Sequence, residues 1–132
     1  MILVDSSVWI NYFNGVKTPG SDRLNSLLGN TPIIMGDLIL VEVLQGFQRD
    51  KDFEVAKDLL SAMPFVEMGG RVLALESAAN YRLLRKRGVT VGKTIDVMIG
   101  TFCIHYRLPL LYDDRDFEPM VKLLGLKTIQ DV

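Results

Sequence analysis

The stretch Met1-Ile2-Leu3-Val4-Asp5 is an apolar run that ends at a carboxylate, and this pattern decides the class of fold. A short apolar run bounded by polar residues is typical of a buried strand. The pattern returns near the other end of the chain, where the run 108–112 leads into Asp113, Asp114 and Asp116. In open α/β sheets, ligands bind at the carboxyl ends of the parallel strands. These acids are therefore expected at a ligand-binding edge of a parallel sheet.

The rest of the chain alternates predicted strands with predicted helices. Apolar runs predict strands at 2–4, 32–35, 65–66, 109–112 and 126–129. Apolar residues at helical spacing predict helices near 6–13, 21–28, 37–47, 50–62, 71–86, 94–107 and 117–124, with a loop at 15–20. This alternation predicts one α/β domain over residues 1–132, with a parallel sheet of about five strands and helices on both faces.

Composition limits the class of protein more than its chemistry. The chain has 132 residues, 48% hydrophobic and 23% charged, which is typical of an ordinary globular core. Its one cysteine, Cys103, lies in an apolar helical stretch, where we expect a core residue, and excludes an intramolecular disulfide. No apolar run approaches the roughly 20 residues of a membrane span, and no basic segment precedes the first run. We therefore expect a cytoplasmic protein without membrane attachment.

Two further carboxylates interrupt apolar segments. Glu42 lies within Leu38-Ile39-Leu40-Val41-Glu42-Val43-Leu44, and Asp96 lies within Thr94-Ile95-Asp96-Val97-Met98-Ile99. Asp96 shares a helix face with Gly100 and Cys103, so that face is predicted to be buried. Four separate segments of the chain thus each offer a carboxylate beside the expected core.

Each acid also has a simpler explanation. Asp5, Asp114 and Asp116 could cap the helices that follow them, and Thr94 could cap the helix that contains Asp96. Glu42 could lie on a solvent-exposed face. Sequence leaves these alternatives open for each acid taken alone.

If the carboxylates converge, their repulsion has a chemical consequence. Two carboxylates about 4 Å apart repel by about 4 kcal/mol at an effective dielectric constant of 20. Such a cluster persists when some members are protonated or when a cation neutralises it. Oxygen ligands without histidine or thiolate favour Mg²⁺ or Mn²⁺, and Mg²⁺ held this way commonly takes phosphate oxygens as further ligands. Since the net charge is only −1, a polyanionic substrate would need bound cations or a local basic patch.

Four stretches together resemble the PIN-domain family, and within it the toxin ribonucleases of VapBC-type toxin-antitoxin pairs. They are ILVDSSVWI at 2–10, VEVLQG at 41–46, TIDVMIG at 94–100 and LLYDDRDF at 110–117, in the family's order and spacing. The resemblance covers essentially the whole chain. It implies a PIN-like fold, a Mg²⁺- or Mn²⁺-dependent endoribonuclease, an RNA substrate, a cognate antitoxin protein and a homodimer.

The resemblance also implies roles for individual residues. Asp5, Asp96 and Asp114 match metal ligands, and Glu42 matches the acid that completes the catalytic cluster, directly or through water. Asp116 matches a more variable acid that assists the site. Three hydroxyl residues match positions that hold the site or the scissile phosphate, with capping as the alternative for each: Ser6, Ser7 and Thr94. Tyr112 stands where many members have threonine or serine, which leaves open whether Asp113 shares the role of Asp114.

A basic segment precedes the Asp96 stretch. Arg85 and Arg87 lie at the end of the predicted helix 71–86, and Lys93 follows shortly after it. These cations could form a rim that binds an RNA backbone. They could equally complement the dipole at the carboxyl end of a helix.

Two other functions remain as alternatives. A haloacid-dehalogenase-like phosphatase would use Asp5 as a nucleophile, but that class needs a second aspartate two residues later, where Ser7 stands. A non-catalytic binding module with a PIN fold is disfavoured by the complete set of acids, namely Asp5, Glu42, Asp96 and Asp114.

Overall fold

The computed structural model describes residues 1–129 and contains a four-stranded parallel sheet in the order β3-β2-β1-β4. The strands are β1 (Ile2–Val4), β2 (Ile33–Gly36), β3 (Phe65–Val66) and β4 (Leu110–Leu111). The central strand β1 pairs with β2 on one side and β4 on the other, and β1 is buried along its length. The predicted parallel α/β class is confirmed. Residues 130–132 of the predicted domain lie outside the described residues.

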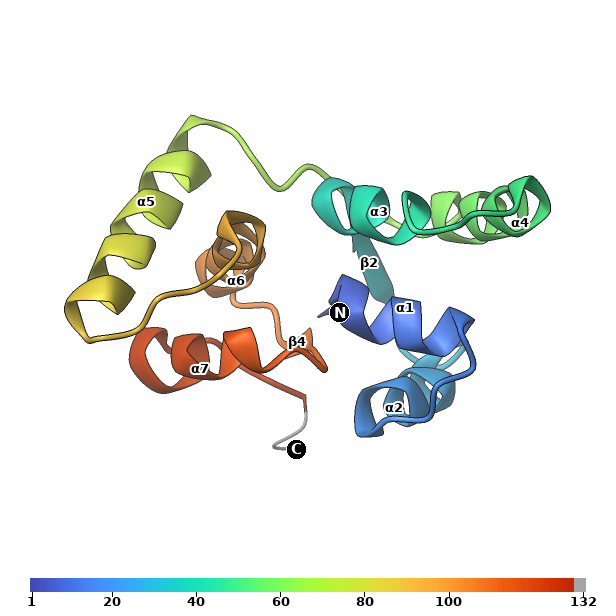
Figure 1. The fold of residues 1–132 in the computed structure, drawn as a ribbon, viewed down its shortest axis with the longest axis horizontal. Helices are drawn as coiled ribbons and strands as arrows, with labels where there is room; N and C mark the ends of the chain where they lie inside the picture. The colour runs from blue at the N-terminus through green and yellow to red at the C-terminus, as the bar shows by residue number, and fades with distance from the viewer. Residues whose placement is uncertain (130–132) are drawn as a thin grey trace.

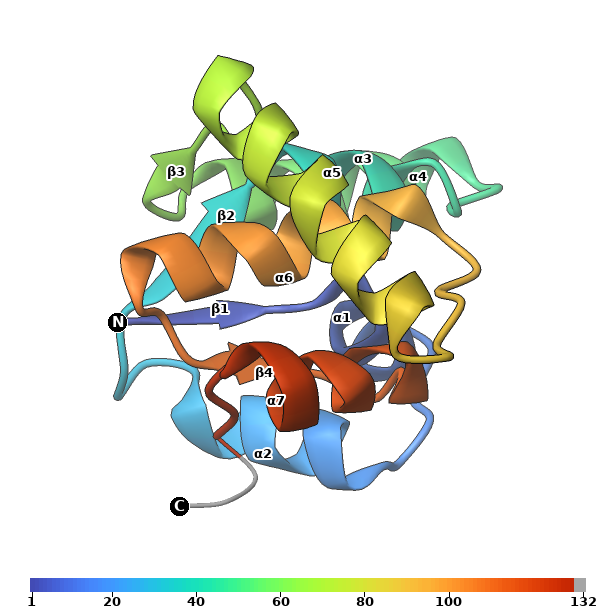
Figure 2. The same cartoon turned by 90° about the vertical axis from the view of Figure 1, so that its left-hand side faces the viewer.

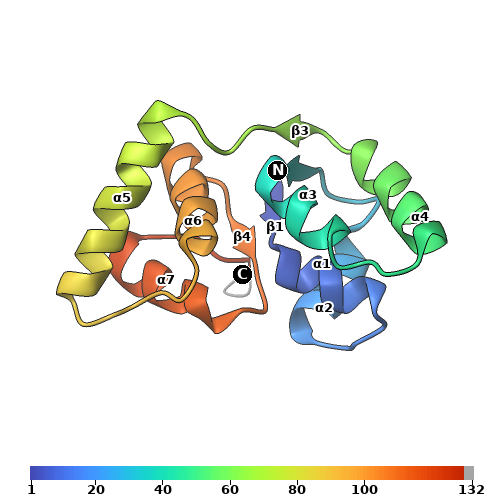
Figure 3. The same ribbon diagram turned by 45° about the horizontal axis from the view of Figure 1, so that its top comes forward.

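Helices cover both faces of the sheet, as predicted. Along the chain they are α1 (Ser6–Phe13), α2 (Pro19–Leu27), α3 (Asp37–Leu44), α4 (Asp50–Ser61), α5 (Arg71–Lys86), α6 (Thr94–Tyr106), the 3₁₀ turn η1 (Arg115–Phe117) and α7 (Glu118–Leu124). Helices α1 to α4 lie on one side of the strands and α5 to α7 on the other (Figures 1 and 3). Helix α5 crosses α6 (Figure 2). Within residues 1–129, no helix has the length and apolar character needed to cross a membrane.

The predicted fifth strand at 126–129 is wrong, so the sheet has four strands and not about five. This segment makes one isolated parallel bridge, between Leu110 and Thr128. The Leu110 N–H donates to the Lys127 carbonyl at 2.9 Å. The partner strand β4 has only two residues, and Pro109 before it has no N–H to extend the ladder.

Helix α2 begins two residues earlier than the predicted loop allows. Thr18 caps it, because the Thr18 hydroxyl accepts from the Ser21 N–H at 2.9 Å and the Ser21 hydroxyl accepts from the Thr18 N–H at 2.8 Å. Pro19 occupies the first helical position, where a missing N–H costs nothing. The proline that suggested a loop therefore starts the helix.

The core lies between β1 and the two layers of helices. Leu3, Val4 and Trp9 are fully buried, and Cys103 is a buried core residue, as predicted. Strand β1 lies between β2 and β4, and Asp5 follows its last residue. Asp5 is therefore buried at the carboxyl edge of the sheet. That placement positions the site described next.

Candidate metal centre

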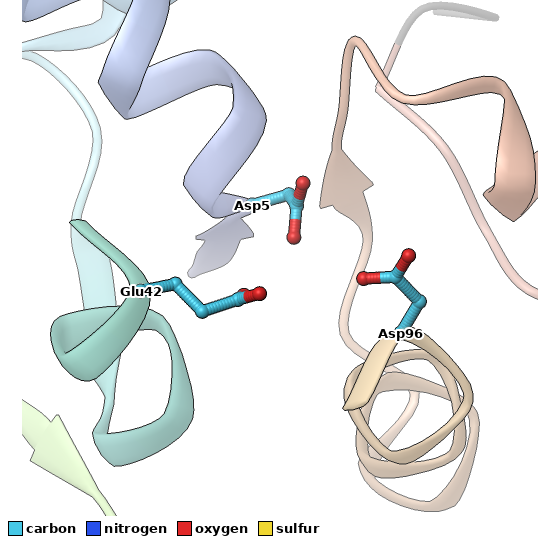
Figure 4. Close-up of side chains that lie close together, drawn as sticks. All are labelled: Asp5, Glu42 and Asp96. Atoms are coloured by element: carbon cyan, nitrogen blue, oxygen red, sulfur yellow. The ribbon is translucent and has the colours of Figure 1, made fainter. Parts of the chain in front are cut away.

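Four acids from four segments line one cleft of about 330 Å³ at the carboxyl edge of the sheet. Asp5 follows β1, Glu42 lies on α3, Asp96 lies on the first turn of α6, and Asp114 precedes η1. Figure 4 shows the carboxylates of Asp5, Glu42 and Asp96 pointing toward one another from three elements. We call this set of four acids the acidic cleft.

Ligand oxygens of the acids fall into two groups that share one member. Asp5, Glu42 and Asp96 each offer an oxygen within 4.8 Å of the others, and so do Asp96, Asp114 and Asp116. Asp96 belongs to both groups. Asp96, in the first turn of α6, thus links the two groups.

Asp5 both caps a helix and faces the cleft, so the two interpretations made from sequence are compatible. Its Oδ2 accepts from the Ser7 N–H at 3.0 Å and from the Ser7 hydroxyl at 2.6 Å, which caps α1. Its Oδ1 is buried and has no hydrogen-bond partner among residues 1–129. One oxygen of Asp5 therefore holds the helix while the other is left for a ligand.

Glu42 and Asp114 are each held by one hydrogen bond. The Ser6 hydroxyl donates to Glu42 Oε1 at 2.8 Å, so this partly buried acid lines the cleft rather than an open solvent face. Asp114 Oδ1 accepts from the Asp116 N–H at 2.9 Å and caps η1. Glu42 is thus oriented by α1, and Asp114 is oriented by the backbone of the turn that follows it.

Asp96 is buried on the face predicted from Gly100 and Cys103, with 3% of its surface exposed. Its Oδ2 is a second buried carboxylate oxygen without a hydrogen-bond partner in the described chain. The suggestion that Thr94 caps α6 is wrong. Lys93 occupies the cap position and no side chain caps this helix, since Thr94 is already its first helical residue.

The acidic cleft raises the pKa of its buried members. Burial raises the pKa of Asp5 to about 6, with a further contribution from the charge of Glu42, against the hydrogen bonds from Ser7. Burial raises the pKa of Asp96 to about 7, and the charges of three acids add to this: Asp5, Asp114 and Glu42. The charge of Lys93 opposes that shift. In the absence of a counter-ion, the charged cluster therefore costs free energy of folding.

The residues present fit a hard divalent cation. Two buried carboxylate oxygens, Asp5 Oδ1 and Asp96 Oδ2, lack donors in the described chain, and buried polar atoms ordinarily have a partner. The acidic groups that could hold an ion consist only of carboxylates, a ligand type that suits Mg²⁺ and Mn²⁺.

Of the other site residues predicted from sequence, some line the acidic cleft and some lie elsewhere. Ser6, Ser7 and Lys93 line the acidic cleft. Arg85 and Arg87 are exposed near the carboxyl end of α5 and are not among the cleft-lining residues, and exposed Thr94 lines a different hollow, between α5 and α6.

Three cleft residues were not predicted: Ile10, Asn11 and Gln45. Asn11 lies four residues after Ser7 and Gln45 lies three residues after Glu42. Helical spacing from the acids and hydroxyls could have identified both.

Asp113 lies outside both acidic groups, although it adjoins Asp114 in sequence. Its carboxylate instead accepts hydrogen bonds from the α1–α2 region, at Asn11, Thr18 and Gly20. The structure thus gives the two neighbouring aspartates different surroundings.

The fold and the site together define an α/β protein with a cluster of carboxylates at the carboxyl edge of a parallel sheet, and this cluster suits a divalent cation. The chain belongs to the PIN domain family, whose model matches residues 2–123. It is 26% identical over 129 residues to the ribonuclease VapC11 of Mycobacterium tuberculosis, covering 96% of each chain.

Solved structures share the fold. The VapBC2 structure from Rickettsia felis, bound to a DNA fragment from its promoter, matches with a TM-score of 0.75 and 15% identity over 97% of each chain. The VapBC-1 structure from nontypeable Haemophilus influenzae matches with a TM-score of 0.71 and 19% identity, covering 97% of this chain and 96% of that one. At these identities the likeness establishes the fold.

Proposed function

We propose that this protein is a metal-dependent endoribonuclease that hydrolyses RNA phosphodiester bonds, and that it is the toxin of a type II toxin-antitoxin pair. The acidic cleft carries the proposal, because it brings four carboxylates together and leaves Asp5 Oδ1 and Asp96 Oδ2 without donors. Membership in the PIN family and similarity to a VapC ribonuclease support the same activity.

The chemistry follows from the ligands. A bound Mg²⁺ or Mn²⁺ would act as a Lewis acid on an oxygen of the scissile phosphate and would lower the pKa of a water molecule. Asp5, Asp96 and Asp114 are the proposed metal ligands, and Glu42 completes the cluster directly or through water. Asp96 belongs to both acidic groups, so its loss should weaken metal binding at either one. Asp116 assists from the second group.

The surrounding residues have separate tasks in this proposal. Ser6 orients Glu42 and Ser7 orients Asp5 through the hydrogen bonds described above. Lys93 lines the cleft and would bind the RNA backbone. Arg85, Arg87 and Thr94 remain candidates for more distant substrate contacts.

The partners follow from the relatives. The Rickettsia felis and Haemophilus influenzae structures are of VapBC, and we propose that this chain likewise binds a cognate antitoxin protein. We also propose a homodimer and action in the cytoplasm. Co-expression with a short reading frame adjoining the gene tests the first point, because a true antitoxin co-purifies with the chain and inhibits its cleavage of RNA.

Cleavage of RNA by the purified full chain tests the proposed activity. We expect cleavage with Mg²⁺ or Mn²⁺, complete loss with EDTA, and recovery when the metal is restored. Asp5→Asn and Asp96→Asn should each lower the rate by more than about 100-fold, since loss of even a supporting residue costs about 10- to 100-fold. The exposed Asp58→Asn makes the same charge change elsewhere and should leave the rate unchanged. Unchanged cleavage in both site variants would contradict the assignment.

The same preparations also test the phosphatase alternative. A haloacid-dehalogenase-like enzyme would release inorganic phosphate from small phosphate esters and form a phosphoenzyme at Asp5. In this chain Asp5 Oδ2 is already bonded twice to Ser7, which stands where that class needs an aspartate. We therefore expect no phosphoenzyme.

A further inference from the structure

Asp113 does not face the acidic cleft, although its neighbour Asp114 does. Asp113 Oδ2 accepts from the Thr18 hydroxyl at 2.6 Å and from Asn11 Nδ2 at 3.0 Å. Asp113 Oδ1 accepts from the Gly20 N–H at 3.1 Å. Both oxygens are thus engaged by the region that joins α1 to α2. We call these three hydrogen bonds the Asp113 contact.

The backbone of Asp113 is hydrogen-bonded to Ser7, a residue that lines the acidic cleft. Its N–H donates to the Ser7 hydroxyl at 3.1 Å, and the same hydroxyl donates to Asp5 Oδ2 at 2.6 Å. One serine therefore joins the loop that carries Asp114 to the carboxylate of Asp5. A movement of Asp113 would therefore shift both Asp5 and Asp114.

The carboxylate of Asp113 packs directly against Gly20 of α2. Gly20 is buried at the second position of this helix, and a Cβ there would lie 2.7 Å from the carboxyl carbon of Asp113. That separation is shorter than any ordinary contact between the two carbons. Glycine at this position is needed for the carboxylate to reach the Gly20 N–H.

We propose that Asp113 is a positioning residue for the reaction: its carboxylate anchors the Asp114 loop to α2, and its N–H fixes Ser7 against Asp5. The inference rests on the proposed function, because it assigns Asp113 to the placement of two proposed metal ligands. Asp113 itself touches neither the metal nor the substrate in this assignment. It holds the relative placement of Asp5 and Asp114, which belong to the two acidic groups that share Asp96.

Gly20→Ala tests the inference from outside the cleft. Alanine is favoured over glycine within a helix by about 1 kcal/mol, so α2 itself should not suffer. The added Cβ would displace the Asp113 carboxylate. We expect Mn²⁺ binding and kcat to fall about 10- to 100-fold, the range for residues that support metal ligands. KM for RNA should change little, while the thermal midpoint should fall because the Asp113 contact is lost. Asn25→Ala, an exposed change on the same helix, is the matched control and should leave all four quantities unchanged.

A double variant separates positioning from simple damage to α2. With Asp113→Ala the added Cβ of Gly20→Ala meets no carboxylate, so the double variant should equal Asp113→Ala alone in Mn²⁺ affinity and kcat. Asp113→Asn keeps an acceptor oxygen and should lose less than Asp113→Ala.

Two results would overturn the inference. The first is wild-type Mn²⁺ affinity and kcat in Gly20→Ala and Asp113→Ala. The second is additive losses in the double variant. If the wild-type chain fails to cleave RNA, the proposed function is wrong, while the Mn²⁺ affinities still decide the role of Asp113.

Discussion

Asp113 and Asp114 are adjacent in sequence, yet they belong to two regions with opposite electrostatics. In the Asp113 contact, one carboxylate accepts three hydrogen bonds and every oxygen is engaged. In the acidic cleft, four carboxylates gather, and buried oxygens of Asp5 and Asp96 lack donors in the described chain. The first region should stabilise the fold without any ion. The second should destabilise it until a cation is bound.

The largest expected effect is a difference in the rate of RNA cleavage between variants of the two neighbouring aspartates. Asp114→Asn should lower the rate of RNA cleavage and the affinity for Mn²⁺ by more than about 100-fold, because it removes a proposed ligand. Asp113→Asn makes the same change one residue earlier, keeps an acceptor for Gly20, and should cost about tenfold. Rate measurements on the two variants check this prediction. Equal losses would show that the two acids share one role.

A pH titration of stability without metal should reveal the strain in the acidic cleft. The folded-state pKa values of Asp5 and Asp96 are raised to about 6 and about 7, so the folded state binds more protons than the unfolded state above the ordinary value of 3.8. Stability should therefore fall as the pH rises from about 4 to about 7, by up to about 1.4 kcal/mol per proton and pH unit, and then level off. Chemical denaturation at several pH values measures this slope.

Metal should reverse that trend. The ion requires deprotonated carboxylates, so its affinity should increase over the same pH range. Saturating Mn²⁺ should raise the stability most at pH 8 and least at pH 5. Equal stability at pH 5 and pH 8 in EDTA would mean that the acids carry no such strain.

Substitutions in the two regions should change stability with opposite signs. At pH 8 in EDTA, Asp96→Asn should raise the free energy of unfolding by about 2 kcal/mol, because it removes a buried charge among like charges. Asp113→Ala should lower it by about 1 to 3 kcal/mol, since the donors at Asn11, Thr18 and Gly20 lose a charged acceptor. Denaturant unfolding measures both. If both variants were destabilised, the proposed opposite effects of the two regions on stability would be wrong.

The smallest expected effect concerns the rim of the acidic cleft. Lys93→Ala should raise KM for RNA a few-fold and reduce the slope of log affinity against log salt by about 1, as expected for one phosphate contact. The exposed Lys122→Ala provides the control. An unchanged salt slope in Lys93→Ala would remove this lysine from the substrate site.

Sequence patterns could indicate three acids of the cleft from local rules, whereas the pattern around Glu42 left a solvent-exposed position open. Asp5 and Asp114 follow strand-like runs, and Asp96 shares a helix face with small or apolar residues. Carboxyl ends of parallel strands meet at one edge, so their approach in space also follows from the class of fold.

The role of Asp113 could not be predicted in the same way. Its direction in the loop is set by Thr18 and Gly20, which lie 95 and 93 residues away in sequence. The start of α2, which supplies those donors, was predicted as a loop because Pro19 was interpreted as a breaker. The false fifth strand has a related cause, since pairing at 126–129 depends on a two-residue partner.

Anomalous diffraction from crystals of the full chain soaked in Mn²⁺ tests the central claim most directly. The account predicts an anomalous peak in the acidic cleft within coordination distance of Asp96, about 2.0 to 2.3 Å, with Asp5 or Asp114 as a further ligand. The peak should be absent from Asp96→Asn crystals soaked in the same way. A wild-type protein that cleaves RNA while its cleft stays empty of Mn²⁺ would contradict the account.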